Sequence, residues 1–600
     1  MSRFHLTSVK KDHVTAGNIS KKAGLNVFGQ KSELGYYIQT YQKRSIDNTN
    51  FVEIGDDWIC SAGTLIRNGK LGKKPLKELY GFLTKEGIKT VRQKFVGHYA
   101  IAAKVGNEIK IFTDPHGSHQ LYYTNPDSTF FIISNSLHTI GHCLNSAEVN
   151  PLAVIQYALQ GAEISSNSLF ENAYRLNGSQ CISIDITGEK MTVHNFDMGM
   201  KTLASNASIQ KSVVEYANIL MDVLHHLDGI NNIALNTTGG LDTRTLLAGI
   251  LNLGLDTMLI YGVGNSRLTN TKRSDLIIAK ELGEQFNLPF YQMDWSGQHP
   301  HSHEKNLANF EKFGFNYTIY GSADSLLKEL QGNISPYPQL QLSGYGPSLS
   351  NSAPWEYPNK EYSIIDLVRL IAPDVIYSKS FVRTTEYEDY LGKSVRTALN
   401  HSDIFYPETE ATLSSLVQAQ TYLRVKAAAG MLNFANEFNY FFAPFMMKRL
   451  HDPLVTVPMK FRTKDEFQVR LTHLLNEDTL MVPVFSGLEP QIIDFEKYNM
   501  NSPKIYHLKR TALSTAQLLF PHIIYPIARK IYTCLDADPD DTLNINKKIR
   551  SNSSKYILEN RLVSNYINGT AYFGLRDLNR LHKVLFGVDE IMKGKNKKNR

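Results

Sequence analysis

Residues 235–244, which read L-N-T-T-G-G-L-D-T-R, constrain the fold of this chain more than any other stretch. The apolar run Ile233–Leu235 leads into them, and apolar residues at helical spacing follow from Leu246 to Leu251. The pattern predicts a strand, a tight turn and a helix. Gly239 and Gly240 let the backbone approach a ligand closely and point N–H groups at it. Because a helix N-terminus carries positive partial charge, the turn suits a phosphate group.

The side chains around the two glycines fit the same use. Thr238 and Thr243 supply hydroxyl donors, and Asp242 supplies a carboxylate that can hold Mg²⁺. The alternative is a plain glycine turn in which Asp242 only favours the start of a helix. The turn is not a Walker A loop, because no Lys-Ser/Thr pair follows the glycines.

The turn resembles the SGGxDS pyrophosphate loop of ATP pyrophosphatases, with threonine at both serine positions. These enzymes cleave ATP between the α and β phosphates, and the loop holds the departing pyrophosphate. The resemblance implies one pyrophosphate-binding set: Thr238, Gly239, Gly240, Leu241, Asp242 and Thr243. It also implies that Asp242 ligates Mg²⁺ and that adenine lies against the backbone at Asn236 and at Tyr261 or Val263.

The composition is that of an ordinary globular protein. The chain has 600 residues, which suggests roughly two to four domains. Hydrophobic residues make up 42% and charged residues 20%, which excludes a disordered chain. Four widely spaced cysteines without a CxxC motif fit a reducing cytosol and argue against a disulfide scaffold and a zinc site. With no signal peptide at the N-terminus, we expect a cytoplasmic protein.

Residues 1–200 read as a mostly β domain, because short apolar runs alternate with turns at hairpin spacing. Four segments resemble markers of a class II glutaminase domain: Gly97–Ala102, Asp114–Gly117, Leu121–Tyr123 and Ile133–Ser136. Because they precede the pyrophosphate-loop sequence, their order resembles that of the asparagine synthetase family over roughly residues 50–490. The resemblance implies an α/β multidomain fold. It further implies an Ntn-hydrolase-like αββα sandwich over 1–200 and a parallel α/β ATP-pyrophosphatase domain over 201–500.

Glutaminase chemistry in that family needs a cysteine at position 2, whose own α-amine acts as the base for its thiol. This chain has Ser2, an intrinsically weaker nucleophile. Asn68 and Gly69 match the Asn-Gly pair of the family's oxyanion hole, but Lys70 stands where the family has a glutamine-binding glutamate. We therefore expect residues 1–200 to be structural, as in the β-lactam synthetase and lasso-peptide cyclase branches.

From about residue 205, alternating helices and buried strands predict a parallel α/β domain, with a helix over 209–226 and a strand over 257–263. Asp275 resembles the aspartate of the family's D-L-x-x-A segment; the alternative is a residue in the first turn of a helix. Ser343 and Gly344 match the family's ATP-contacting pair. Ser348, in contrast, replaces its second Mg²⁺-binding aspartate.

Tyr345 replaces a catalytic glutamate of the family. β-Lactam synthetases also carry tyrosine at this place, paired with a later glutamate that helps to deprotonate an amine. Glu386 or Glu388 lies at a suitable distance in sequence for that role; the alternative for both is a solvated helix face.

Other parts of the acyl-transfer machinery are missing. Met447 occupies an aspartate position of the family, and no lysine follows Pro483 where the family has a catalytic one. Lys497 and Lys504 are the nearest later candidates for the catalytic lysine. The alternative is that both are ordinary surface residues. The site therefore keeps its nucleotide loop and departs from the family in its catalytic residues.

We expect residues 501–600 to form a mostly helical extension with a basic tail over 593–600. The stretch 511–528 lacks Asp, Glu, Lys and Arg, and its length is at the edge of a membrane span. Two prolines lower its hydrophobicity, so we favour a buried helix pair and keep peripheral membrane contact as the alternative.

Three functions follow from these features. The first is an ATP- and Mg²⁺-dependent amide ligase, which would adenylate a small-molecule or peptide carboxylate and let ammonia or an amine attack. The second is a pseudoenzyme that binds nucleotide or serves as a scaffold. The third is an RNA-modifying ATP pyrophosphatase, disfavoured because no large basic or aromatic-rich stretch is present, so we expect no nucleic-acid partner. The sequence is also compatible with a homodimer.

Overall fold

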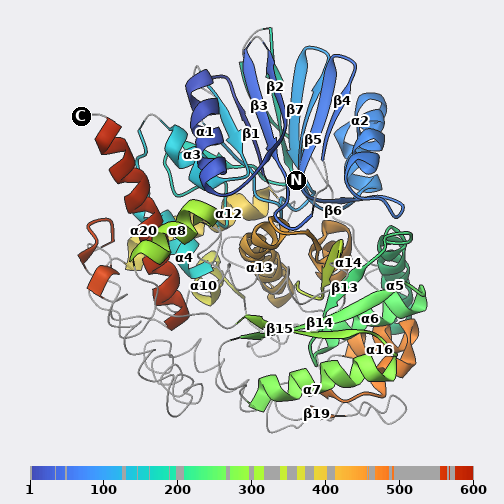
Figure 1. Ribbon diagram of the computed structural model, residues 1–600. Helices are drawn as coiled ribbons and strands as arrows, with labels where there is room; N and C mark the ends of the chain where they lie inside the picture. The colour runs from blue at the N-terminus through green and yellow to red at the C-terminus, as the bar shows by residue number, and fades with distance from the viewer. Residues whose placement is uncertain are drawn as a thin grey trace.

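The computed structural model describes the chain in several stretches. They are residues 3–33, 35–46, 50–124, 130–144, 146–160, 163–187, 190–196, 208–264, 270–295, 303–315, 338–346, 361–371, 384–401, 412–455, 457, 466–485, 490–491, 555–557, 559–563, 567 and 575–598. These residues form a mixed α/β structure with two six-stranded antiparallel sheets, a five-stranded parallel sheet and surrounding helices (Figure 1).

The N-terminal half contains the two antiparallel sheets. The first has the order β10-β8-β9-β1-β3-β2, from β1 (Arg3–Thr7), β2 (Val27–Glu33), β3 (Tyr36–Tyr41), β8 (Tyr122–Thr124), β9 (Ile132–Ser134) and β10 (Ala173–Arg175). The second has the order β12-β11-β7-β6-β5-β4, from β4 (Phe51–Ile54), β5 (Asp57–Ile66), β6 (Val96–Val105), β7 (Glu108–Thr113), β11 (Gln180–Asp185) and β12 (Lys190–Asn195).

The two sheets pack face to face, with helices outside them. Successive residues of a strand point to opposite faces, so β6 contributes Ala100 and Ala102 to the core between the sheets. Its Tyr99 and Ile101 face the other way, into the core under α2 (Lys73–Lys94). Helices α1 (Lys10–Lys22) and α3 (Leu137–Cys143) pack on the first sheet. The layers are therefore helix, sheet, sheet and helix.

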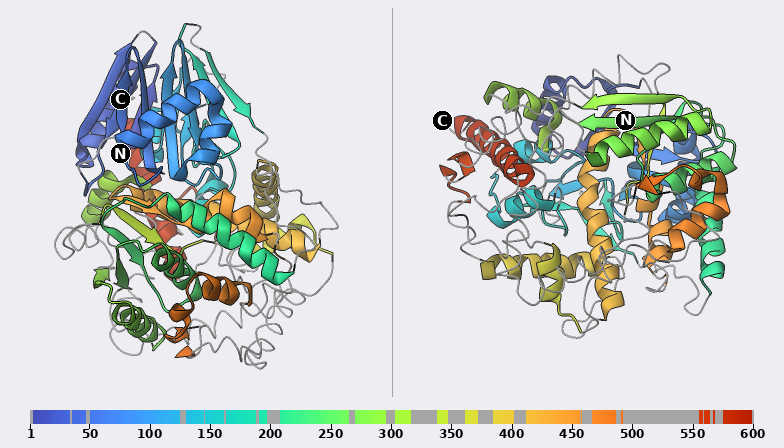
Figure 2. Two further views of the ribbon diagram at one scale, coloured as in Figure 1. Left: turned by 90° about the vertical axis from the view of Figure 1, so that its right-hand side faces the viewer. Right: turned by 90° about the horizontal axis from the view of Figure 1, so that it is seen from below.

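The parallel sheet lies in the second half, on the far side of the molecule from the free end of the antiparallel sheets (Figure 2). Its order is β15-β14-β13-β16-β17, from β13 (Ile233–Asn236), β14 (Thr257–Gly264), β15 (Phe290–Trp295), β16 (Leu340–Ser343) and β17 (Tyr440–Phe442). The chain starts in the middle at β13, builds outward through β14, and then crosses to β16. This reversal places a topological switch point between β13 and β16, where α/β proteins bind ligands at the carboxyl ends of the strands.

Helices surround this sheet and fill the space beside it. They are α5 (Ile209–His225), α6 (Leu241–Asn252), α7 (Asn270–Gln285), α8 (His303–Phe313), α10 (Ile364–Ile371), α12 (Thr384–Asn400), α13 (Leu413–Asn436), α14 (Lys448–Val455) and α16 (Glu466–Leu475). Two 3₁₀ turns, Pro444–Met446 and Glu477–Leu480, and a ribbon of β18 (Val484–Phe485) and β19 (Pro490–Gln491) complete the described part. Helices α6 and α16 pack closely together, and α16 also contacts α5.

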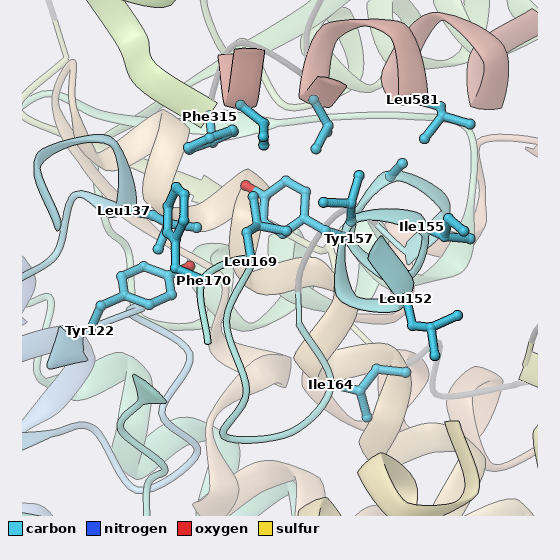
Figure 3. Close-up of a cluster of buried hydrophobic side chains, with 14 of the residues drawn as sticks. Tyr122, Leu137, Leu152, Ile155, Tyr157, Ile164, Leu169, Phe170, Phe315 and Leu581 are labelled. Carbon is cyan, nitrogen blue, oxygen red and sulfur yellow. The ribbon is translucent and has the colours of Figure 1, made fainter. Parts of the chain in front are cut away.

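The C-terminal helix α20 (Leu575–Lys598) returns to the N-terminal half. It packs on α4 (Pro151–Gln160) and α3, and its Leu581 joins the same buried cluster as Tyr157 and Phe170 (Figure 3). Phe315, at the end of α8, packs edge-on against both aromatic rings with centroid distances of 6.3 Å. The described part of 501–600 thus contains a helix, as expected, that joins segments far apart in sequence.

No helix among the described residues is both long and apolar enough to cross a membrane. The stretch 511–528 lies outside the described residues.

Candidate functional site

The glycine turn lies between β13 and α6, at the carboxyl end of the central strand. β13 ends at Asn236, and Gly240 caps α6 in an extended conformation, with φ −79° and ψ 168°. The Thr238 backbone N–H donates to Thr243 Oγ1 at 3.3 Å, and the two threonine hydroxyls lie 3.2 Å apart. Thr238 is exposed and Thr243 is buried. The predicted strand, turn and helix are confirmed.

The loop after β16 meets this turn at the switch point. A Cβ atom on Gly344 would lie 2.7 Å from the Thr243 backbone nitrogen, so only glycine allows the two loops to approach this closely. The Tyr345 backbone N–H donates to Ser343 Oγ at 3.1 Å. The structure therefore brings together Thr243, Ser343 and Gly344, which belong to two separate predicted nucleotide-binding segments.

Polar side chains connect the ends of the central strands. Gln341 Nε2 donates to Asn236 Oδ1 at 2.6 Å, and Asn439 Nδ2 donates to Gln341 Oε1 at 3.2 Å. This chain of amides fixes the Asn236 side chain beside the switch point. Sequence reasoning missed Gln341 and Asn439. Gln341 is, however, a polar residue within the apolar strand β16, which is a detectable signal.

Asp275 contacts the turn directly. Its Oδ1 accepts a hydrogen bond from the Gly239 backbone N–H at 2.9 Å. Burial raises the pKa of the Asp275 carboxyl, while the bond from Gly239 opposes that rise. Tyr261 on β14 has its pKa raised to about 12, by burial first and then by Asp275. Because α7 begins at Asn270, Asp275 lies beyond the helix's first turn.

Asp242, the predicted Mg²⁺ ligand, faces α16. Its Oδ1 accepts a hydrogen bond from Gln468 Nε2 at 2.9 Å, and the Asp242 side chain is half-buried. The next residue but one, Arg244, is fully buried and donates to the carbonyls of Thr479, Val482 and Pro483. These contacts anchor the start of α6 to α16 and the segment after it. Neither Gln468 nor Arg244 was predicted, because both contacts span more than 200 residues.

The two catalytic candidates occupy different elements. Tyr345 follows β16, and its side chain is 48% exposed at the edge of the switch point. Glu386 lies in the first turn of α12 and is exposed. The main contacts of α12 are with α4, α10 and α13, and not with α6 or β16. Pairing of Tyr345 with Glu386 thus stays a prediction.

The Asn68–Gly69 pair packs against the end of α5. The Asn68 backbone N–H donates to His226 Nδ1 at 3.3 Å, and the Gly69 backbone N–H donates to the His226 carbonyl at 2.8 Å. A Cβ atom on Gly69 would collide with the Asp228 carbonyl oxygen. The backbone N–H groups of both residues are therefore engaged by the second half of the chain.

Several predicted site residues lie outside the described residues: Ser2, Ser348, Lys497 and Lys504. Arg3, the first described residue, is buried, and its Nη2 forms an ion pair with Glu437 Oε1 at 2.7 Å. The start of β1 therefore packs against the end of α13 in the second half.

A cavity of about 330 Å³ lies elsewhere, between α2 and the amino ends of β13 and β16. Lys70, Lys73 and Lys74 line it together with Asn231 and Gln339, which precede the two strands. Because parallel α/β sheets bind their ligands at the carboxyl ends of the strands, we do not assign this cavity to the nucleotide site.

No family model matches the chain, and no curated protein matches it in sequence. Among solved structures, glutamine phosphoribosylpyrophosphate amidotransferase from B. subtilis, complexed with ADP and GMP, is 9% identical. The match has a TM-score of 0.23 and covers 48% of this chain and 65% of that one, so more than a third of the amidotransferase is unmatched.

Two further solved structures are similar in part. An allosteric regulatory enzyme of purine biosynthesis is 9% identical, with a TM-score of 0.23, and the match covers 50% of this chain and 81% of that one. Glutamine-dependent NAD⁺ synthetase from Acinetobacter baumannii, in complex with ADP, is 13% identical, with a TM-score of 0.15 and coverage of 34% and 43%. Likenesses this weak carry no argument, so the functional case rests on the geometry of the site.

Proposed function

We propose that this chain is an ATP-dependent amide-bond-forming enzyme of the asparagine synthetase type that does not hydrolyse glutamine. One observation carries the proposal: the turn 238–243 and Gly344 meet at the switch point of the parallel sheet, with no room for a Cβ atom between them. In this reading the N-terminal layers are an Ntn-type domain and the parallel sheet belongs to an ATP-pyrophosphatase domain.

The proposed reaction has two steps. A substrate carboxylate oxygen attacks the α-phosphorus of ATP, the bond between the α-phosphorus and the bridging oxygen breaks, and pyrophosphate leaves. An amine or ammonia then attacks the acyl carbon of the adenylate, loses a proton, and expels AMP. The turn would bind the pyrophosphate through its N–H groups and the Thr238 and Thr243 hydroxyls. Tyr345, exposed at the edge of the site, would face the acyl centre.

The donor set fits a weakly held Mg²⁺ ion. Asp242 supplies one carboxylate at the start of α6, and Mg²⁺ commonly combines one or two carboxylates with phosphate oxygens and water. When bound, the ion would neutralise charge on the phosphates. Gln468 would orient the Asp242 carboxylate through its 2.9 Å hydrogen bond.

The absence of glutamine hydrolysis has separate support. His226 occupies both backbone N–H groups of Asn68 and Gly69, so they are not available to stabilise an oxyanion. The nitrogen would then come from ammonia, from a separate amine, or from an amine within the same substrate.

A pseudoenzyme is the second candidate, favoured by Ser2, by Ser348 and by the missing lysine after Pro483. For either candidate, one contact of the turn must change before a phosphate binds. The Gly239 N–H, which a pyrophosphate would need, is held by the Asp275 carboxylate. A phosphate can take that place only if Asp275 moves or becomes protonated. The two candidates share the nucleotide site and differ in turnover.

An assay with hydroxylamine separates them. Hydroxylamine is a strong amine nucleophile, so it converts acyl adenylates into stable hydroxamates. The full chain would be incubated with Mg²⁺, α-labelled ATP, hydroxylamine and pools of carboxylates. We expect AMP, pyrophosphate and hydroxamate in equal amounts with a pool that contains the substrate. ATP binding without AMP release in every pool would favour the pseudoenzyme, and ADP release would contradict cleavage between the α and β phosphates.

A further inference from the structure

Three buried side chains from the two halves of the chain meet next to the 3₁₀ turn Pro444–Met446. His116 lies on the connection between β7 and β8, and His451 and Asp452 lie on α14. Each offers one ligand atom, and these atoms all lie within 4.8 Å of one another. In the described part of the chain, this is the only group of three His, Cys, Asp or Glu residues with that spacing.

The tautomer of His116 is fixed by the backbone. His116 Nδ1 lies 2.8 Å from the Met446 carbonyl oxygen, which can only accept, so Nδ1 carries the proton. The lone pair is therefore on Nε2, which is buried and has no hydrogen-bond partner among the described residues. Metal-binding histidines commonly donate their second ring N–H to a backbone carbonyl in this way.

The loop that carries His116 is held firmly. Asp114 Oδ1 accepts the backbone N–H groups of His116 and Ser118, each at 3.1 Å, and the Ser118 hydroxyl at 2.6 Å. Lys426 Nζ, from α13, donates to the His116 carbonyl at 2.6 Å. These contacts fix the backbone that carries the ring, and the Met446 carbonyl orients the ring itself.

On α14, the two ligand candidates are adjacent. His451 Nδ1 lies 3.6 Å from Asp452 Oδ1, and the His451 and His116 rings meet edge-on with centroids 4.9 Å apart. Asp452 Oδ2 forms an ion pair with Lys448 Nζ at 2.8 Å, and Oδ1 lies on the side of His451. All three residues are at most 4% exposed.

The donor atoms of the group select the kind of cation. The two imidazole rings are buried and meet edge-on. Neutral imidazole is the form that binds metal. Two nitrogen donors and one carboxylate suit a zinc-like ion, whereas Mg²⁺ and Ca²⁺ prefer sites made of oxygen ligands.

We propose that His116 Nε2, a ring nitrogen of His451 and Asp452 Oδ1 bind one divalent transition-metal ion of the zinc class. In tetrahedral zinc sites with N/O ligands about 2.0–2.1 Å from the metal, neighbouring ligand atoms are about 3.3 Å apart. The present spacing of up to 4.8 Å therefore needs only small side-chain rotations. The ion would join the β7–β8 connection of the N-terminal half to α14 of the second half. The site is independent of the proposed amide-forming activity.

The test measures zinc bound to the full-length protein after dialysis against a competing chelator. The variant His116→Asn keeps a donor for the Met446 carbonyl and removes the ring lone pair. The control is His138→Asn. His138 is also buried and lies beside a second histidine, His142, with ring centroids 4.9 Å apart. Among the described residues it belongs to no group of three potential metal ligands. We expect one zinc per chain in the wild type and the control, and affinity at least about 100-fold weaker in His116→Asn.

A second measurement keeps the proposal testable if His116→Asn does not fold. Co²⁺ added to the wild-type protein should give the intense visible absorption of a four-coordinate site, and Zn²⁺ should abolish it, whereas Mg²⁺ should not. Zinc binding that is equal in the wild type and in folded His116→Asn would overturn the proposal. So would a wild-type protein that retains no zinc and shows no such Co²⁺ absorption.

Discussion

Two aspartates at the glycine turn show how single residues decide what the turn can bind. Asp275 accepts the Gly239 N–H, and Asp242 accepts from Gln468. These contacts tie the turn to α7 and α16. Asp275 also places a carboxylate where a pyrophosphate would sit. Burial raises the pKa of the Asp275 carboxyl, so protonating it costs less free energy. Protonated Asp275 carries no negative charge and would no longer repel a bound pyrophosphate.

Glu163 gives a prediction at the same scale. Burial raises its pKa from 4.5 to about 7, and Tyr122 Oη donates to its Oε2 at 3.1 Å. Between these two pH values the unfolded chain ionises while the folded protein keeps the proton. Stability therefore falls as pH rises from 4.5 to 7, by a loss on the order of 3 kcal/mol that persists above pH 7.

Glu163→Gln removes that loss, because glutamine stays neutral and still accepts from Tyr122. We expect the variant to melt higher than the wild type at pH 8 and at nearly the same temperature at pH 4. The exposed Glu171 provides the control, and Glu171→Gln should change neither value. An equal difference between Glu163→Gln and the wild type at both pH values would contradict the assignment.

At the scale of elements, the close approach of the β16 loop to the start of α6 defines the site. Gly344→Ala places a methyl group 2.7 Å from the Thr243 backbone nitrogen, so one of the two loops must move. We expect Mg²⁺-ATP binding, measured by calorimetry, to weaken by about tenfold or more, which corresponds to about 1.4 kcal/mol. Gly81→Ala is the matched control, since a Cβ atom there meets nothing within 4 Å. Unchanged affinity in Gly344→Ala would place the nucleotide elsewhere.

Local elements were predictable because their determinants are adjacent in sequence. The helix expected over 209–226 is α5 (Ile209–His225), and the strand expected over 257–263 is β14 (Thr257–Gly264). In α5 the apolar residues Leu220 and Val223 are buried, whereas Val214 is 40% exposed. The turn was predicted from Gly239 and Gly240, and Gly344 was predicted as part of the nucleotide site from the family resemblance.

The rest could not be predicted because it depends on contacts between distant segments. Asp242 meets Gln468, the Asn68–Gly69 pair meets His226, and His116 meets His451. No periodicity or spacing reports such pairs. The absence of a CxxC motif argued against a zinc site. That argument covers only ligands close together in sequence, and the ligands proposed above come from the two halves of the chain.

At the scale of the whole molecule, a buried charge cluster joins the two halves. Glu437, at the end of α13, pairs with Arg3 of β1 at 2.7 Å and with Arg44 at 3.3 Å. All three side chains are nearly inaccessible to solvent. The guanidinium of Arg44 also donates to the Lys312 carbonyl at 2.6 Å, which adds α8 to the cluster.

Glu437→Gln should therefore destabilise the protein strongly, because two buried guanidinium groups lose their counter-charge. Breaking one partner of a buried ion pair costs about 3–5 kcal/mol. Thermal unfolding followed by circular dichroism would show a lower melting temperature. Glu311→Gln breaks the exposed ion pair with Lys22 and should have little effect. Equal effects of the two substitutions would show that the cluster does not stabilise the contact between the halves.

The central claim is that the turn 238–243 binds the phosphates of ATP. The most direct test is the melting temperature of the wild type and of Asp242→Asn, each with and without Mg²⁺-ATP. Asparagine keeps an oxygen that can accept from Gln468 and removes the charge that would hold Mg²⁺. At about 100 times its Kd, the nucleotide should stabilise the wild type by about 2.7 kcal/mol. We predict a rise in melting temperature for the wild type that shrinks in Asp242→Asn. No rise in the wild type, or an equal rise in both proteins, would contradict the account.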